Sequence, residues 1–275
     1  MRNFNFTKMN GLGNSFILMN DLDGAVSTGT DVRDLAIKVC DRNFGIGADG
    51  LILVCKADKG DFRMTIINED GSEPEMCGNG VRCFAQFLVD EGLTSKTALV
   101  VSTLAGLIRT EVLADGQVRV DMGAPVLRNS DVVAPAGELA QVSTDGFDFT
   151  FVSMGNPHAI AFVDSLDFDW RTPGARIENN RKLFPNRTNV EFVKVNSETD
   201  VTMKVWERGC GETMACGTGA CALVVAGVEH QKLSEEPVTV HLPGGDLIIE
   251  YRKGSHVIMT GPAVSDCSGI YQYNS

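Results

Sequence analysis

Two cysteines of the sequence stand in the same short motif. Cys77 lies in the segment EPEMCGNG (residues 73–80) and Cys216 in ETMACGTG (residues 212–219), so both follow the pattern E-x3-C-G-x-G. A helical segment opens directly after each motif, over residues 81–91 and 220–230. A cysteine at a helix start faces unpaired N–H groups and the positive end of the helix dipole, which should lower its thiol pKa. We therefore expect two reactive thiols.

The glycines of the motifs allow backbone amides to come close to a bound carboxylate. Two thiols that face one carbon from opposite sides can invert a stereocentre, because one thiolate removes a proton while the other thiol delivers a proton. Close thiols titrate as a pair, since loss of the first proton disfavours loss of the second. A Gly-rich turn with a buried cysteine would explain one copy of the motif, whereas two copies favour this acid/base chemistry.

The elements that position the two motifs also repeat. The cysteines are 139 residues apart (216 minus 77), and other matched segments recur at nearly this offset. Short β-branched runs predict strands over residues 51–54, 62–67, 98–101 and 108–112 in the first half, and over 159–163, 190–195, 201–206, 238–242 and 247–251 in the second. The nearly all-apolar segment 220–228 predicts a helix buried inside a sheet.

These patterns predict an α+β fold of two pseudo-symmetric lobes. Each lobe is expected to be a curved, mostly antiparallel sheet wrapped around a central helix, with the active site in the cleft between the lobes. We place the N-terminal lobe at residues 1–117 and the C-terminal lobe at 118–263. The tail, residues 264–275, is left open to pack on the N-terminal lobe.

Composition excludes several classes of function. Lys and Arg number 24 against 36 Asp and Glu, a formal net charge of -12. A nucleic-acid surface needs a basic face, so we expect no nucleic-acid partner. The longest apolar stretch, Ala220–Val228, is about half of the roughly 20 residues that cross a membrane, so we expect no membrane span. The first residues lack the apolar core of an export signal, which predicts a cytoplasmic protein.

The eight cysteines favour thiols over a disulfide framework, because no export signal precedes them. Neither the spacing of Cys77 and Cys83 nor that of Cys210, Cys216 and Cys221 forms a Cys-x-x-Cys pair. That spacing argues against zinc, and we predict no metal site.

Seven segments spread over the chain resemble the diaminopimelate epimerase family. They are KMNGLGNSF (8–16), GIGAD (45–49), NEDGSE (68–73), CGNGVRC (77–83), MGNPH (154–158), ERG (207–209) and ACGTGAC (215–221). The resemblance implies an isomerase without a cofactor that interconverts LL- and meso-2,6-diaminopimelate in lysine and peptidoglycan precursor biosynthesis. The implied partner is a small-molecule substrate, and whether the chain forms a homodimer is left open.

The resemblance also implies roles for single residues. Cys77 and Cys216 become the acid/base pair, with His158 and Glu207 at the reaction centre. The remaining residues bind substrate: the amides of Gly78, Asn79, Gly217 and Thr218 hold the reacting carboxylate, while Asn14, Asn68, Asn156, Asn189, Glu207 and Arg208 contact the rest of the molecule. Physical chemistry suits these assignments, since Arg208 can grip a carboxylate bidentately and Glu207 can pair with an ammonium.

Three positions depart from the family pattern: Asn10 stands where His is common, Ser15 where Asp is frequent, and Gly50 where some relatives have Gln. Gly50, which pairs with Asn189 at an offset of 139, is left out of the site. A related racemase of the proline or hydroxyproline type is the main alternative. A thiol redox or metal-binding protein is a second alternative. Which thiol removes the proton of the LL isomer stays open.

Overall fold

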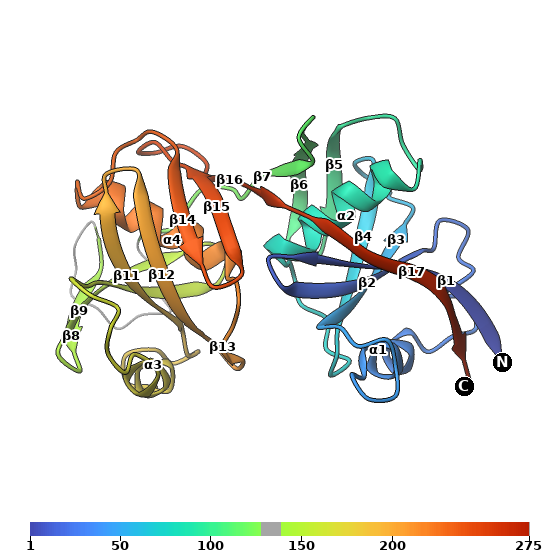
Figure 1. The fold of residues 1–275 in the computed structure, drawn as a ribbon, viewed down its shortest axis with the longest axis horizontal. Coiled ribbons are helices and arrows are strands. Elements are labelled where there is room, and N and C mark those ends of the chain that lie inside the picture. The colour runs from blue at the N-terminus through green and yellow to red at the C-terminus, as the bar shows by residue number, and fades with distance from the viewer. Residues whose placement is uncertain (128–138, 275) are drawn as a thin grey trace. The chain divides into compact units, whose positions relative to one another are not determined.

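The chain forms two compact units. The computed structural model describes residues 1–127 and 139–274. The first unit comprises Met1–Val120 together with the chain from Gly261 onward, and the second comprises Asp121–Thr260. Figure 1 shows both units, with the N-terminal strand and the C-terminal strand in the same one.

The first unit is a mixed sheet with two helices. Its strands follow one another across the sheet in the order β17 (Val264–Tyr273), β1 (Arg2–Gly11), β2 (Asn14–Asn20), β3 (Gly50–Cys55), β4 (Phe62–Asn68), β5 (Ala98–Thr103), β6 (Gly106–Val112) and β7 (Gln117–Asp121). Only the neighbours β2–β3 and β4–β5 are parallel. A parallel pair needs a long crossover. The helices α1 (Val32–Cys40) and α2 (Gly78–Asp90) lie in these two crossovers.

The second unit repeats this arrangement. Its strands follow the order β8 (Gln141–Thr144), β9 (Phe147–Ser153), β10 (Pro157–Phe162), β11 (Asn189–Ser197), β12 (Asp200–Glu207), β14 (Val238–Leu242), β15 (Gly245–Glu250) and β16 (Ile258–Pro262), with the short β13 (Gly211–Glu212) beside β12. The parallel neighbours are β10–β11 and β12–β14, and α3 (Arg171–Glu178) and α4 (Gly217–Glu229) lie in their crossovers. The predicted repeat of an α+β architecture is confirmed.

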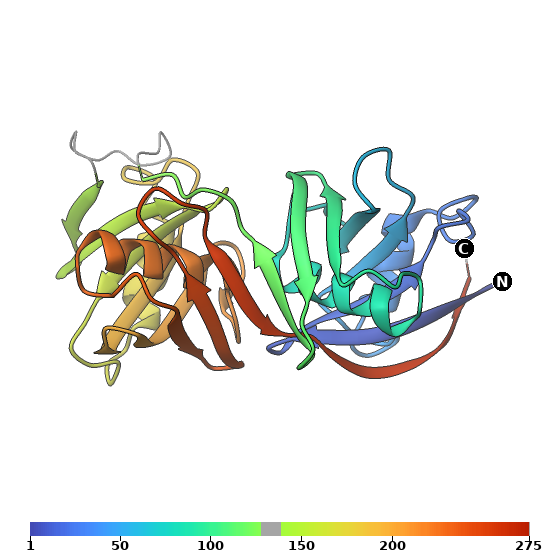
Figure 2. The same cartoon turned by 90° about the horizontal axis from the view of Figure 1, so that it is seen from above.

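The helices α2 and α4 are the central helices of the two units. In Figure 1 and Figure 2 each lies against the strands of its own unit. Every residue of α4 except Thr218 and Glu229 is buried, as its apolar sequence predicts. Both helices begin three residues earlier than expected, because the motif glycines form the first turn and the cysteine is the N-cap.

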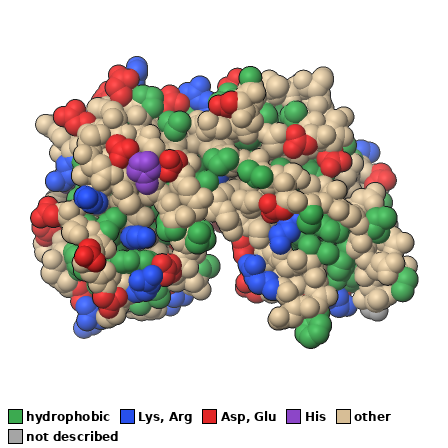
Figure 3. Space-filling view, in the orientation of Figure 1, with side chains coloured by type: hydrophobic (Ala, Val, Ile, Leu, Met, Phe, Trp, Pro, Cys, Tyr) green, Lys and Arg blue, Asp and Glu red, His purple; other side chains and the backbone are tan. Residues whose placement is uncertain are grey.

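No helix among the described residues is long and apolar enough to cross a membrane. On the face drawn in Figure 3, Lys and Arg side chains are scattered among Asp and Glu side chains.

Candidate active site

Cys77 and Cys216 occupy the same position in their units, the N-cap of the central helix. Both have extended backbone angles, with φ -137° and ψ 115° at Cys77 and φ -116° and ψ 101° at Cys216. The Cys77 Sγ accepts the N–H of Gly80 at 3.4 Å, and the Cys216 Sγ accepts the N–H of Gly219 at 3.4 Å. Each sulfur thus takes the place of the side-chain oxygen that usually caps a helix.

Four predicted carboxylate-binding residues form the first turns of these helices. Gly78 and Asn79 are the first two residues of α2, and Gly217 and Thr218 are the first two of α4. The first turn of a helix presents its backbone N–H groups at the helix end, and the helix dipole favours an anion beside them. Each thiol therefore lies beside a ready-made site for a carboxylate.

In the first unit, Asn14 connects Cys77 to the half-buried Asp49. Its Oδ1 accepts from the Cys77 Sγ at 3.7 Å and from the Asn79 Nδ2 at 3.2 Å. Its own Nδ2 donates to Asp49 Oδ2 at 2.7 Å, which fixes the orientation of the amide. Asn68 ends β4, opposite Gly50 of β3, and its Nδ2 donates to the Ser72 Oγ at 2.9 Å.

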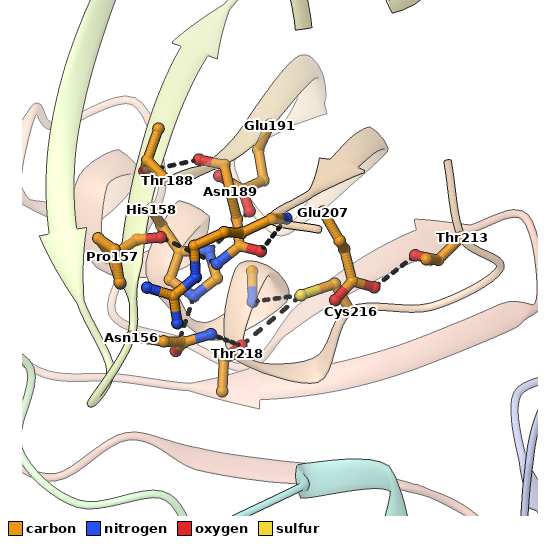
Figure 4. Close-up of polar contacts among 12 residues, drawn as sticks. Asn156, Pro157, His158, Thr188, Asn189, Glu191, Glu207, Thr213, Cys216 and Thr218 are labelled. Carbon is orange, nitrogen blue, oxygen red and sulfur yellow. Dashed lines mark hydrogen bonds and ion pairs between the residues drawn. The ribbon is translucent and has the colours of Figure 1, made fainter. Parts of the chain in front are cut away.

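In the second unit, polar side chains from three elements converge on Cys216 (Figure 4). The Thr218 Oγ1 lies 3.6 Å from the Cys216 Sγ and accepts from the Asn156 Nδ2 at 3.2 Å. The Asn156 Oδ1 lies 3.1 Å from the His158 Nε2, and the His158 Nδ1 lies 2.7 Å from the Glu191 Oε1. A continuous chain of hydrogen bonds therefore joins the fully buried Glu191 to the thiol.

The predicted substrate-binding residues Asn189 and Arg208 lie next to each other. The Asn189 side chain is buried, donating to the Pro157 carbonyl at 2.9 Å and accepting the N–H of Arg208 at 2.9 Å. Arg208 is exposed, and no carboxylate among the described residues pairs with its guanidinium. Asn189 therefore holds the backbone that presents Arg208.

Glu207 is the last residue of β12, directly before Arg208, and its side chain contacts Cys216. Its Oε1 accepts from the Thr213 hydroxyl, and its carboxyl is also within hydrogen-bond reach of Cys216. Burial raises the pKa of Glu207, and the hydrogen bonds of Thr213 and Cys216 oppose that shift.

The surroundings of Cys216 favour the neutral thiol over the thiolate. Burial raises its pKa well above the ordinary thiol value, and the carboxylates of Glu207 and Glu191 raise it further. The hydrogen bonds from Thr218 and Gly219 act in the opposite direction. The expectation of a lowered pKa at the helix start is wrong for Cys216, because desolvation outweighs the favourable helix end.

The atoms of His158, Glu191 and Cys216 that could bind a metal lie within 4.8 Å of one another. The hydrogen bond between His158 and Glu191 already uses a ring nitrogen and a carboxylate oxygen. The geometry therefore suits a hydrogen-bonded network better than a metal centre.

Three acidic residues that support the site were missed from the sequence. Asp49 orients Asn14, Glu191 contacts His158, and Glu178 accepts the N–H of Gly209 at 2.6 Å beside Arg208. Glu191 had a usable signal, since it is a charged residue that interrupts the apolar run of residues 190–193, all of which are buried. Asp49 lies in a motif already noted, without a role, and Glu178 stands in a polar segment that gives no signal.

Comparison with known proteins points to one family. A family model described as "Diaminopimelate epimerase" matches residues 6–128 and 150–265. Proteins with the same description are similar over nearly the whole chain: one from Desulfitobacterium hafniense is 50% identical, covering 96% of both chains, and one from Carboxydothermus hydrogenoformans is 48% identical, covering 97% of this chain and 98% of its own.

Solved structures share the fold at low sequence identity. A PhzF-family phenazine biosynthesis protein from Bacillus anthracis aligns with a TM-score of 0.74 at 16% identity, covering 99% of this chain and 100% of its own. A hydroxyproline epimerase from Agrobacterium vitis aligns with a TM-score of 0.71 at 15% identity, covering 98% and 92%. These two likenesses concern the fold alone.

Proposed function

The chain belongs to the diaminopimelate epimerase family, and from that premise we propose that it interconverts LL- and meso-2,6-diaminopimelate by moving a proton at one α-carbon. This is an isomerase reaction of lysine and peptidoglycan precursor biosynthesis. The observation that carries the proposal is the pair of cysteines that cap equivalent helices in two units of equal topology. Inversion needs two such acid/base groups, one for each face of the carbon.

We assign the two roles in the resting enzyme from the surroundings of Cys216. Its raised pKa keeps the thiol protonated at neutral pH, so Cys216 starts as the proton donor and Cys77 as the base. After one turnover the roles are exchanged. The amides of Gly78, Asn79, Gly217 and Thr218 hold the carboxylate and stabilise the charge that develops when the α-proton leaves.

The other residues recognise the rest of the substrate. Arg208 is the proposed partner of the distant carboxylate, and Glu207 and His158 are proposed to act beside the Cys216 thiol. Asn14, Asn68 and Asn156 supply amide donors and acceptors, and Asn189 acts through the backbone of Arg208. Arg208 is exposed and has no carboxylate partner in the part of the chain that the structure describes, which suits a substrate with a second charged end, a feature that proline lacks.

The assigned role of Cys216 predicts its reactivity toward alkylating agents. A thiol reacts as the thiolate, so a raised pKa moves the pH midpoint of the reaction upward. We expect the rate of Cys216 modification by iodoacetamide, followed by peptide mass spectrometry, to reach its midpoint well above the roughly pH 8.5 of a cysteine in an unstructured peptide. A midpoint at or below that of the peptide would contradict the assignment.

The function is tested by exchange in D₂O. Pure LL-diaminopimelate is incubated with the protein, and the meso product is analysed for deuterium at the inverted α-carbon. One deuterium per product molecule supports proton removal and delivery from solvent-exchanged groups. If LL-diaminopimelate stays unchanged while L-proline or trans-4-hydroxy-L-proline is epimerised in a parallel reaction, the proline-type alternative replaces the proposal.

Thiol acid/base groups must stay reduced, which favours the cytoplasm over an oxidising compartment. Analytical ultracentrifugation of the purified protein measures whether the chain forms a homodimer.

A further inference from the structure

The two units differ in what lies behind their cysteines. Strand pairing makes the positions comparable, since His158 is opposite Asn189 in the parallel pair β10–β11, and Phe16 is opposite Gly50 in the parallel pair β2–β3. Two residues further along, Glu191 of β11 corresponds to Ile52 of β3. The pair His158 and Glu191 of the second unit thus replaces the apolar pair Phe16 and Ile52 of the first.

The contacts with the central helices support this correspondence. A Cβ atom added to Gly219 would lie 2.7 Å from the Glu191 Oε1, and one added to Gly80 would lie 3.2 Å from the Ile52 Cδ1. Each side chain therefore packs against the third residue of its central helix, next to the N-cap cysteine.

The first unit shows that this topology forms with an apolar pair at these positions. His158 and Glu191 both have side chains with no exposed surface. Burying ionisable groups is costly, and replacing such a pair by apolar residues is often neutral or stabilising. The polar pair of the second unit therefore has a purpose other than the stability of the fold.

The hydrogen bonds from this pair to Cys216 have one consistent direction. With the Asn156 amide in the orientation that the structure gives it, Oδ1 can only accept, so the His158 Nε2 beside it carries a hydrogen. The remaining nitrogen, Nδ1, faces the Glu191 Oε1 at 2.7 Å, and the two groups share one proton whichever of them holds it. The other carboxylate oxygen of Glu191 is buried without a partner among the described residues.

The same direction of hydrogen bonding continues from Asn156 through Thr218 to the sulfur of Cys216. With Oδ1 turned to His158, the Asn156 Nδ2 donates to the Thr218 Oγ1, which leaves the Thr218 hydroxyl hydrogen available to the Cys216 Sγ at 3.6 Å. Figure 4 shows these side chains following one another from Glu191 to Cys216. If Nε2 carried no hydrogen, the Asn156 amide would turn around and the Thr218 hydroxyl would donate to Asn156 instead of to the sulfur.

We propose that Glu191 is a positioning residue of the active site, which holds Nδ1 of His158, keeps a hydrogen on Nε2 and thereby directs the hydrogen-bond donors of Asn156 and Thr218 toward Cys216. The catalytic meaning of this arrangement rests on the function proposed above. Burial raises the pKa of Glu191, which agrees with a proton retained between the carboxyl group and the ring.

The tautomer of His158 tests the arrangement without any activity measurement. The chain has four histidines, so nitrogen NMR of protein with ¹⁵N-labelled histidine gives few signals, and His158→Gln identifies those of His158. We expect a protonated Nε2 at pH 7. An unprotonated Nε2 would overturn the proposal, whether or not the protein epimerises diaminopimelate.

Two substitutions separate hydrogen bonding from charge and from packing. Glu191→Gln keeps a group that can donate N–H to Nδ1, so we expect kcat within about threefold of the unchanged protein. Glu191→Met keeps a similar volume without polar atoms, and we expect a fall in kcat of about 10- to 100-fold, with KM changed much less. Equal losses in both variants would show that the charge is what matters, and an active Glu191→Met would show a packing role. Either result overturns the proposal.

Controls separate these effects from loss of folding. Glu229→Gln changes a carboxylate at the opposite end of α4, where it accepts from the Tyr251 hydroxyl at 2.9 Å, and should leave kcat unchanged. Glu191→Met leaves the buried His158 Nδ1 without its partner, so its thermal unfolding should begin at a lower temperature than in the unchanged protein, and kcat is compared well below that temperature. If Glu191→Met does not fold, the tautomer of His158 and the activity of Glu191→Gln still decide, because a protonated Nε2 and an active Gln variant are both required.

Discussion

Cys216→Ser and Cys77→Ser are each expected to lower kcat for epimerisation by about 10²- to 10⁴-fold, the usual contribution of a general acid or base. A serine hydroxyl can occupy the N-cap and accept the same helix N–H, so each helix start should persist. The hydroxyl holds its proton far more tightly than a thiol, so it cannot act as the base. The measurement is the steady-state rate with LL- and meso-diaminopimelate.

The same variants reveal which thiol serves which isomer. A variant with one thiol can still remove a proton from the face that this thiol serves, but it cannot return one to the other face. We therefore expect slow exchange of the α-hydrogen with D₂O for one isomer in Cys77→Ser and for the other isomer in Cys216→Ser. Near-normal epimerisation in either variant would rule out the two-thiol mechanism.

Substitutions at two other cysteines are controls for the general effect of removing a thiol from the protein. Cys40→Ala removes a buried thiol from α1, and Cys267→Ser changes an exposed residue of β17. Both proteins should retain their kcat, although Cys40→Ala should unfold at a lower temperature because it leaves a small cavity.

Arg208→Ala is expected to raise KM for diaminopimelate by about 10- to 100-fold while kcat changes much less. This is the size of a lost charged hydrogen-bond pair, about 1.5–3 kcal/mol, and a group remote from the reacting carbon binds substrate and transition state alike. Arg208→Lys should fall in between, because an ammonium keeps the charge but not the bidentate geometry. Initial rates over a range of substrate concentrations separate KM from kcat.

A nearby arginine provides the comparison for Arg208. Arg181 is also exposed in the second unit, where its guanidinium donates to the Pro185 carbonyl at 2.9 Å. Arg181→Ala should leave KM unchanged. If Arg208→Ala also leaves KM unchanged, the distant carboxylate of the substrate is bound elsewhere.

Much of the fold was predictable because the repeat and the strand patterns are local properties of the sequence. The strands β3, β4, β5, β6, β10, β11, β12, β14 and β15 all fall on the predicted runs. Alternating or continuous apolar residues mark such buried strands. The central helices were predicted for the same reason, and only their first turns were missed, because glycines are poor helix formers away from an N-terminus.

Other elements leave no such pattern. The helix α3 contains Pro173 and Gly174, which usually interrupt helices. The strand β17 is exposed along most of its length, so its sequence shows no buried face, and it is a strand because β1 pairs with it. Contacts between distant segments decide both cases, and a local pattern cannot show them.

The candidate site also has features that the sequence predicts and features that only the folded chain shows. The positions of Cys77 and Cys216 at helix starts follow from neighbouring glycines and could be predicted. The direction of the Cys216 pKa shift could not be predicted. It depends on how deeply the thiol is buried and on Glu191 of β11 and Glu207 of β12, which are distant from Cys216 or unrelated to its motif in the sequence. The supporting role of Glu178 likewise requires the folded chain.

The pairing of β17 with β1 has a consequence for synthesis of the chain. The second unit is continuous in sequence, whereas the first unit begins at the N-terminus and receives its last strand only after Gly261 has been made. Until then, β1 presents an unpaired edge from Arg2 to Asn10, and such edges invite association with other chains. Domains usually mature from the N-terminus as they leave the ribosome. Here the half that is translated first is the last to be completed.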